Sequence, residues 1–154
     1  MSLVSDQDFT EAMNAAGDGW LKAMSVRWVR VTLDEVVAEW DVEEKHTQAY
    51  GIVHGGVHCG VIESVASVGA AINAMSRGQS VVGLENQTSF IRAVRGGRLR
   101  ATGKPVTRGR TTQVWEVSIT DEQARVVAKG SVRLLCLDAG APLAGGAATP
   151  RSGG

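Results

Sequence analysis

The sequence has few aromatic residues, only two cysteines and no surplus of charge of either sign. Aromatic side chains make up 5% of the 154 residues, which leaves little to stack against the bases of a nucleic acid. Lysine plus arginine number 16, as do aspartate plus glutamate, so overall charge gives no reason to expect a polyanionic partner. No GxxxxGK[ST] motif occurs, which argues against a P-loop nucleotide site. We therefore expect no nucleic-acid partner.

Export and membrane signals are also missing. The first 19 residues contain neither the basic nor the apolar region of a signal peptide. Without such a signal, we expect Cys59 and Cys136 to be reduced thiols in a cytoplasmic protein. The apolar run over residues 57–75 includes His58, Glu63 and several serines and glycines. It is too polar for an unassisted membrane span, and we expect no membrane partner.

The hydrophobic pattern predicts an α+β domain in which a long helix packs on an antiparallel sheet. We expect a short helix over residues 6–16, a strand pair at 20–32 and 35–44, and a loop over 45–53. A long, mostly buried helix should begin at or just after Gly55-Gly56 and end near residue 76. Four strands at 80–94, 98–107, 111–120 and 125–137 should follow, joined by short turns that include a hairpin at Gly96-Gly97. This pattern indicates a helical segment (1–19), a folded domain (20–137) and a disordered tail (138–154).

Glu63 is the only formally charged residue between Lys45 and Arg77. One helical turn away lie small uncharged residues, among them Cys59 and Ser67. A buried carboxylate without partners is costly, so it is usually paired, neutralised or functional. A partly exposed, solvated helix face is the alternative reading of this residue.

The glycine pair Gly55-Gly56 opens the predicted helix. Free backbone N–H groups at a helix start can stabilise an anion or a developing oxyanion. Together with Glu63 as a nucleophile or general base, this suggests acyl-transfer chemistry. Gly55 and Glu63 would lie about 12 Å apart along a helix, too far to reach one carbonyl. We favour a two-fold dimer in which Gly55 of one chain faces Glu63 of the other.

Two other readings of this stretch are weaker. His54 and His58 have the i, i+4 spacing of a metal pair, but no third ligand is evident, so we expect no metal. Cys59 could act as a nucleophile with His58, yet adjacent helical residues point about 100° apart. A buried structural cysteine is the better reading.

No acidic residue occurs between Asn86 and Trp115, although seven basic residues do: Arg92, Arg95, Arg98, Arg100, Lys104, Arg108 and Arg110. These residues form either a solvated strand face or an anion site for phosphates.

Residues 48–64, QAYGIVHGGVHCGVIES, and residues 81–132 resemble the hotdog-fold acyl-CoA thioesterases. The likeness is strongest to the hydroxybenzoyl-CoA and dihydroxynaphthoyl-CoA branch and covers roughly residues 20–137. It implies a hotdog fold, a long central helix wrapped by an antiparallel sheet. It also implies homodimers that form a continuous sheet, usually assembled into tetramers, with active sites at the dimer interface and no cofactor.

The resemblance also implies residue roles. Gln48 would orient substrate and water, the Gly55 N–H would polarise the thioester carbonyl, and the partner's Glu63 would be the nucleophile or general base. The acyl site would be lined by His54, Ser67 and Ser89, although relatives that place a histidine at position 89 leave the acyl preference open. Contacts to CoA would come from Arg92, Arg108, Arg110 and Thr111.

The leading interpretation is an acyl-CoA thioesterase acting on aromatic or medium-chain acyl groups. A thioesterase acting on an acyl carrier protein is an alternative, because the basic stretch could meet an acidic carrier. A non-hydrolytic acyl-CoA-binding protein is a third, against which the retained Gln48, Gly55 and Glu63 argue. A hotdog hydratase would need an Asp/His or His/Glu arrangement that the sequence does not show.

Overall fold

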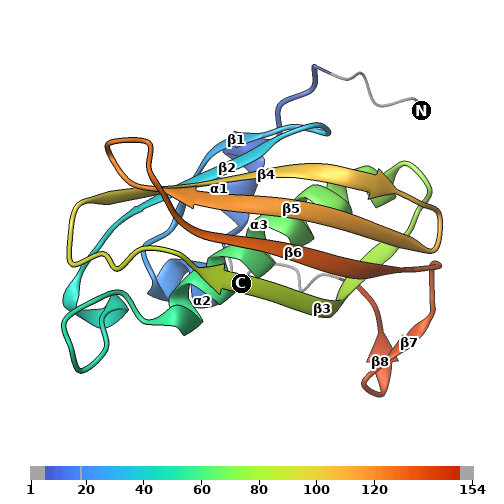
Figure 1. Cartoon of the computed structure of the whole chain (residues 1–154). Helices are drawn as coiled ribbons and strands as arrows, with labels where there is room; N and C mark the ends of the chain where they lie inside the picture. Colours follow the sequence, from blue (N-terminus) through green and yellow to red (C-terminus); the bar gives the residue numbers. More distant parts are fainter. Residues whose placement is uncertain (1–5, 18, 150–154) are drawn as a thin grey trace.

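The computed structural model describes residues 6–17 and 19–149. Three helices, one 3-10 turn and six long strands make up the main body of this part of the chain (Figure 1). In chain order the elements are α1 Thr10–Ala16, α2 Gly19–Ala23, β1 Arg27–Val31, β2 Val36–Asp41, η1 Glu44–His46, α3 Gly55–Met75, β3 Ser80–Phe90, β4 Arg98–Arg108, β5 Thr112–Thr120, β6 Val126–Leu137, β7 Pro142–Leu143 and β8 Gly146–Ala147.

The six long strands form one antiparallel sheet in the order β1-β2-β4-β5-β6-β3. The helix α3 runs along one face of this sheet (Figure 1). Between them lies a core that includes Trp40, Trp115, Ile62 and Val65, none of which is exposed. The predicted α+β hotdog architecture, with a long central helix and an antiparallel sheet, is confirmed.

The helix α3 begins at Gly55, where the glycine pair predicted a helix start. His54 is its N-cap residue, and Nδ1 of this side chain accepts a 2.8 Å hydrogen bond from the Gly56 N–H. By length and composition α3 could span a membrane, but half of its apolar 18-residue stretch is buried inside the fold. It is the core helix of the domain.

The expected strand over residues 20–32 is wrong in its first part. Residues Gly19–Ala23 form α2 instead, and the strand β1 covers only Arg27–Val31. A helical turn points Leu21 into the core, and the Met24 N–H donates to the Trp20 carbonyl. The alternating pattern misled here because a single helical turn can bury one apolar residue as well as a strand can.

The expected hairpin at Gly96-Gly97 is also wrong. Strand β3 pairs with β6, while β4 lies between β2 and β5. The connecting segment crosses the end of the sheet, where the Val94 carbonyl accepts from Val53 and the Gly97 carbonyl from Val42. Turn residues show where a chain bends but not which strands pair. As a result, β3 is an edge strand with one unpaired side.

Both terminal segments pack onto the domain. The Phe9 N–H donates to the Val31 carbonyl, and Asn14 bonds both backbone groups of Trp28. The expected disorder of the tail is not found over residues 138–149, where β7 and β8 form a small hairpin. Ser80 Oγ holds this hairpin through a 2.6 Å hydrogen bond to the Ala148 carbonyl. Residues 150–154 lie outside the described residues.

Candidate active site

The Glu63 carboxylate is half-buried and is held by neutral groups. Asn86 Nδ2 donates to its Oε2 at 3.2 Å, and Ser67 Oγ lies 3.5 Å from Oε1, at the long limit of a hydrogen bond. Thr88 Oγ1 donates to Asn86 Oδ1 at 2.7 Å, which fixes the orientation of the amide. No cation pairs with Glu63 within residues 6–17 and 19–149. A partly exposed, solvated helix face is thus an incomplete description of Glu63, because neighbouring side chains hold its carboxylate in place.

Gly83 of β3 makes room for the carboxylate. A Cβ atom at this position would collide with Oε1 of Glu63. The register of β3 against β6 also shifts between Gly83 and Glu85, which leaves Leu84 as the extra residue of a bulge. Bulges often occur on edge strands beside active sites, where they redirect the chain. The free edge of the sheet is therefore shaped around Glu63.

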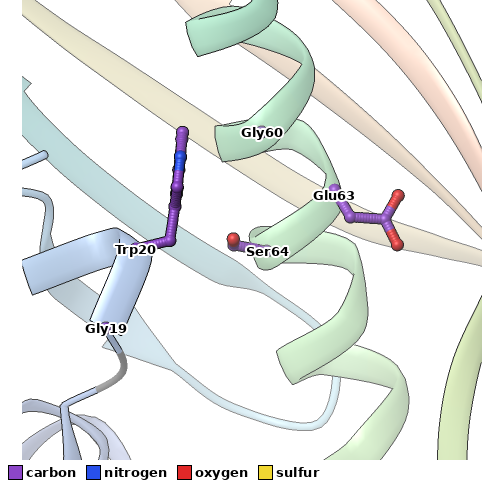
Figure 2. A pocket seen from close by; sticks show the side chains of 5 residues that line it. All are labelled: Gly19, Trp20, Gly60, Glu63 and Ser64. Atoms are coloured by element: carbon purple, nitrogen blue, oxygen red, sulfur yellow. The ribbon is translucent and has the colours of Figure 1, made fainter. Parts of the chain in front are cut away.

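A cavity of about 460 Å³ adjoins this part of α3 and is lined by Gly19, Trp20, Gly60, Glu63 and Ser64. Figure 2 shows the Trp20 indole and Ser64 on one side of the helix, with the Glu63 side chain directed to the other side. The indole lies against the helix because Gly60 has no side chain; a Cβ there would collide with the ring. Trp20 was not predicted as a site residue.

A second cavity, of about 340 Å³, lies at the start of α3. It is lined by Gln48, Ile52, Val53, Gly55, His58, Phe90, Ile91, Arg92 and Ala93. Of the first N–H groups of the helix, that of Gly56 bonds the His54 side chain and that of Val57 bonds the His54 carbonyl. The Gly55 N–H has no partner among the described residues. It is the donor left for a ligand.

Gln48 is held in a tight loop beside Gly55. Its backbone N–H donates to Ile52 and its carbonyl accepts from Gly51, while its side-chain Oε1 accepts from the Tyr50 N–H. Arg95 closes the loop with a 2.7 Å hydrogen bond to the Tyr50 carbonyl. The Gln48 side-chain amide nitrogen keeps its donors for a ligand, since no described residue accepts from it.

His58 was considered in the sequence only as a metal ligand or a base for Cys59. The structure places it in the Gly55 cavity with 3% of its surface exposed. Its ring lies 6.2 Å from that of Phe90, centroid to centroid. Burial lowers the pKa of His58 to about 4, so the imidazole is neutral near pH 7.

The structure divides the predicted residues between two places. Gln48, Gly55 and Arg92 line the cavity at the helix start, whereas Glu63 lines the other, and Ser67 contacts Glu63. Eight helical positions separate Gly55 from Glu63, or about 12 Å along the axis. No single chain therefore brings the Gly55 N–H and the Glu63 carboxylate to one carbonyl.

Four predicted residues lie away from both cavities. Ser89 points to the face of β3 opposite α3, because side chains alternate along a strand and its neighbour Phe90 contacts Gly55. Arg108 bonds Asp34 and Asn73 near the far end of α3. Arg110 and Thr111 lie in the β4–β5 turn next to it. Within one chain, these three residues are not beside Arg92.

Most of the basic stretch is engaged in surface pairs. Arg98 pairs with Asp41, Arg100 with Glu39, Lys104 with Glu35 and Arg108 with Asp34, while Arg95 bonds Tyr50. Within the described ranges, only Arg92 and Arg110 of the seven have no side-chain partner. Of these two, Arg92 lines the Gly55 cavity. The solvated-face reading is correct for most of these residues, and Arg92 is the one placed to contact a ligand there.

Metal binding finds no support in these positions. Among residues 6–17 and 19–149, no group of three or more His, Cys, Asp or Glu side chains could hold an ion. His54 caps the helix, and Cys59 and Cys136 are unpaired thiols.

The sequence profile of the thioesterase superfamily matches residues 50–128. This range includes Gly55, Glu63 and Arg92. The chain belongs to this superfamily.

Named relatives agree with this assignment. A provisionally named esterase of Mycobacterium tuberculosis is 43% identical over 118 residues, which cover 75% of this chain and 84% of the relative. The 1,4-dihydroxy-2-naphthoyl-CoA hydrolase of Escherichia coli is 34% identical over 117 residues, covering 75% of this chain and 85% of the relative. The chain is thus similar to enzymes named as esterases and CoA-thioester hydrolases.

Solved structures show the same fold. The structure of the Mycobacterium tuberculosis esterase superposes with a TM-score of 0.77 at 42% identity, covering 80% of this chain and 98% of that one. The structure of AziG from S. sahachiroi superposes with a TM-score of 0.75 at 41% identity, covering 79% and 98%. With the family and these relatives, this thioesterase-superfamily protein is a thioester hydrolase.

Proposed function

We propose that this protein is an acyl-CoA thioesterase whose active site is shared between two chains. The observation that carries the proposal is the division of the machinery: a Gly55 N–H without a partner among the described residues in the cavity at the helix start, and a Glu63 carboxylate held against β3 eight helical positions away. Thioester hydrolysis requires both a donor that activates the carbonyl and a base or nucleophile. The Gly55 N–H can serve as the donor, and the Glu63 carboxylate as the base or nucleophile. A second copy of the chain would join the halves.

The edge strand β3 is suited to this assembly. In the part of the chain that the structure describes, only one side of β3 is paired, and the strand carries exposed apolar side chains near the cavities: Leu84 at 47%, Phe90 at 59% and, just beyond it, Ile91 at 56%. A long apolar edge strand is a template for pairing with another strand. Antiparallel pairing of two β3 strands would extend the sheet through a homodimer. Assembly of such dimers into a tetramer is a further part of the proposal.

The contacts of β3 suggest the register of this pairing. Phe90 lies against Gly55, and Asn86 bonds Glu63. A two-fold axis near Thr88 would place Phe90 of one chain opposite Asn86 of the other. The Gly55 N–H of one chain would then lie on the same side of the extended sheet as the Glu63 carboxylate of its partner. This register turns two half-sites into one complete site.

Hydrolysis then follows from the roles of these groups. The thioester carbonyl oxygen accepts from the Gly55 N–H, which stabilises the negative charge that develops there. The partner's Glu63 either attacks the carbonyl carbon or removes a proton from an attacking water, and the Gln48 amide orients the reactants. Collapse of the tetrahedral intermediate expels the CoA thiolate, which takes up a proton. In the covalent route, water then hydrolyses the acyl-Glu63 anhydride.

The substrate carrier is proposed to be CoA. The Arg92 side chain has no partner among the described residues and lies at the exposed rim of the Gly55 cavity, where it can meet a phosphate. An acyl carrier protein was an alternative because of the seven basic residues. Five of these residues form ion pairs or hydrogen bonds within the fold, so the stretch offers no broad positive surface. The basic stretch therefore no longer argues for an acyl carrier protein. A cytoplasmic location is part of the same proposal.

The acyl group is proposed to be aromatic or of medium length. Apolar side chains such as Ile52 and Phe90 line the Gly55 cavity, which the acyl group would enter. Apolar walls with a few polar groups are typical of small-molecule sites.

The test is a hydrolysis screen of aromatic and straight-chain acyl-CoAs, in which released thiol is measured. Glu63→Gln keeps the shape but removes the charge, and we expect the rate to fall at least ~10²-fold while CoA-thioester binding persists. Ser76→Ala, an exposed change at the end of α3, is the control. Near wild-type turnover by Glu63→Gln would refute the role of this carboxylate, and no turnover of any acyl-CoA by the wild type would refute the substrate class.

A further inference from the structure

His58 has a buried polar atom without a partner. Its side chain is 3% exposed, and Nδ1 finds no hydrogen-bond partner in the described part of the chain. Buried side-chain polar atoms are bonded in the large majority of cases, so an exception calls for an explanation. His58 also lines the Gly55 cavity. Nδ1 itself has almost no exposed surface, so a molecule in this cavity reaches that atom only when the imidazole ring turns.

The cavity has an outer and an inner end. Arg92 is exposed at the outer end, while His58 is buried, with its ring 6.2 Å from that of Phe90. On the proposed function, a thioester whose carbonyl meets Gly55 must leave the charged nucleotide of CoA in solvent, because burying phosphates is costly. The nucleotide then lies at the Arg92 end. The acyl group is directed inward, toward His58.

We propose that His58 is a specificity-determining residue, whose imidazole forms a hydrogen bond with a hydroxyl or amino substituent of the acyl group. The proposal rests on the proposed function and adds a residue to it. His58 lies one helical turn after Gly55, on the same side of α3, and both residues line the cavity. An acyl ring between them would also contact Phe90, whose ring is tilted by 33° against the imidazole.

The chemistry of a neutral imidazole fits this role. Burial holds the pKa of His58 at about 4, so near pH 7 one ring nitrogen donates and the other accepts. A hydroxyl group can complement either nitrogen, since it both donates and accepts. An unsubstituted ring would leave the imidazole unpartnered and lose the corresponding binding energy. Discrimination against the unsubstituted acyl group follows.

The experiment compares benzoyl-CoA with its ortho-, meta- and para-hydroxy derivatives in steady-state kinetics. We expect the wild type to prefer at least one hydroxy isomer over benzoyl-CoA by about 10-fold or more in kcat/KM. In His58→Phe, this ratio should fall toward one, and His58→Gln, which keeps a neutral hydrogen-bonding group, should retain part of it. Cys59→Ala changes the same helical turn but lines neither cavity, so it should keep the wild-type ratio.

Outcomes separate the two proposals. Hydrolysis of all four thioesters at similar kcat/KM, or a preference that survives His58→Phe, would overturn the role of His58 and leave the thioesterase assignment standing. No hydrolysis of any of them or of other acyl-CoAs would overturn both.

A second measurement does not require a His58 variant to fold. In Glu63→Gln, binding of the preferred hydroxy isomer should shift an imidazole nitrogen-15 resonance of His58 into the hydrogen-bonded range, and benzoyl-CoA should not. Equal shifts with both ligands would contradict the proposal.

Discussion

One amide, that of Asn86, holds both the Glu63 carboxylate and the helix that carries it. Its Nδ2 lies 3.2 Å from Glu63 Oε2 and 3.1 Å from the Cys59 carbonyl oxygen. Because Asn86 belongs to β3, the edge strand and the carboxylate are positioned together. Any partner that binds along β3 meets a carboxylate already aimed by that strand.

Removal of this amide should impair turnover more than binding. Asn86→Ala leaves Glu63 Oε2 without its donor, and we expect kcat to fall about 10-fold, the equivalent of one net hydrogen bond, with little change in KM. Gln87→Ala, the next residue on the opposite face of β3, is the matched control. Steady-state kinetics on one acyl-CoA, with melting temperatures for both variants, decide the matter. A rise in KM with unchanged kcat would place Asn86 in substrate binding instead.

Arg92 should contribute to CoA binding at a distance from the reacting carbonyl. Arg92→Ala is expected to raise KM more than it lowers kcat on an acyl-CoA, and to have little effect on a short acyl thioester without the nucleotide. Arg100→Ala removes an arginine that already pairs with Glu39, so it should affect neither substrate. If Arg92→Ala slows both substrates equally, the residue does not contact the nucleotide.

The β3 register near Thr88 predicts a specific cross-link. With the two-fold axis there, position 87 of one chain opposes position 89 of the other, at the short separation of an antiparallel pair that a disulfide can bridge. The double variant Gln87→Cys, Ser89→Cys should form disulfide-linked dimers on mild oxidation, detected by non-reducing electrophoresis.

The control for this cross-link lies on the neighbouring strand. Ser131 and Lys129 of β6 are the register partners of Gln87 and Ser89. The variant Ser131→Cys, Lys129→Cys has the same spacing but no free edge, and it should remain monomeric under denaturing conditions. Wild-type protein controls for Cys59 and Cys136. Equal cross-linking of both double variants would contradict the β3 pairing.

His58 should make the stability of the fold sensitive to acid. Burial lowers its pKa from the ordinary 6.5 to about 4. As pH falls below 6.5, the unfolded chain takes up a proton on this side chain before the folded chain does, so the free energy of unfolding decreases until pH 4 and then levels off. The full effect is on the order of 3 kcal/mol. Denaturant titrations of His58→Asn should show a flatter decline in the free energy of unfolding between pH 6.5 and 4 than those of the wild type. His54→Asn is the control. An unchanged slope in His58→Asn would refute a lowered pKa of His58.

Much of this fold could be predicted from local sequence. The start of α3 follows from Gly55 and Gly56, because a glycine pair before an apolar run is a helix boundary. The four later strands follow from alternation and turn residues. The pairing of β3 with β6 could not be predicted, since partners are chosen by long-range packing against α3. The α2 turn could not be told from a strand, because a single helical turn buries one apolar residue, Leu21, as well as a strand would.

The site was predicted where an isolated feature marked it. Glu63 is conspicuous as a lone charge, and the glycines mark a free N–H. His58 and Phe90 carry no such signal, because a histidine or an aromatic in an apolar stretch is most often part of the core. Their role depends on a cavity formed by two segments far apart in the sequence, residues 48–58 and 90–93. Likewise, the sequence could not distinguish Arg92 from the neighbouring arginines, because only the structure shows which of them form ion pairs.

A shared site makes a quantitative prediction for mixed dimers. Gln48→Ala and Glu63→Ala should each be inactive alone, since every site in either homodimer lacks one residue. In a mixed dimer, one site takes both defects and the other takes the intact Gln48 of one chain and the intact Glu63 of its partner. With random assortment half of the dimers are mixed, so co-expressed chains should recover about a quarter of wild-type activity in a symmetric two-site dimer. The measurement is hydrolysis by the co-purified pair against each variant alone.

A site contained within one chain would give no recovery, because neither chain carries both residues. Recovery would also explain why no cation among the described residues pairs with Glu63: on this proposal its functional partners are the thioester and the Gly55 N–H of the other chain.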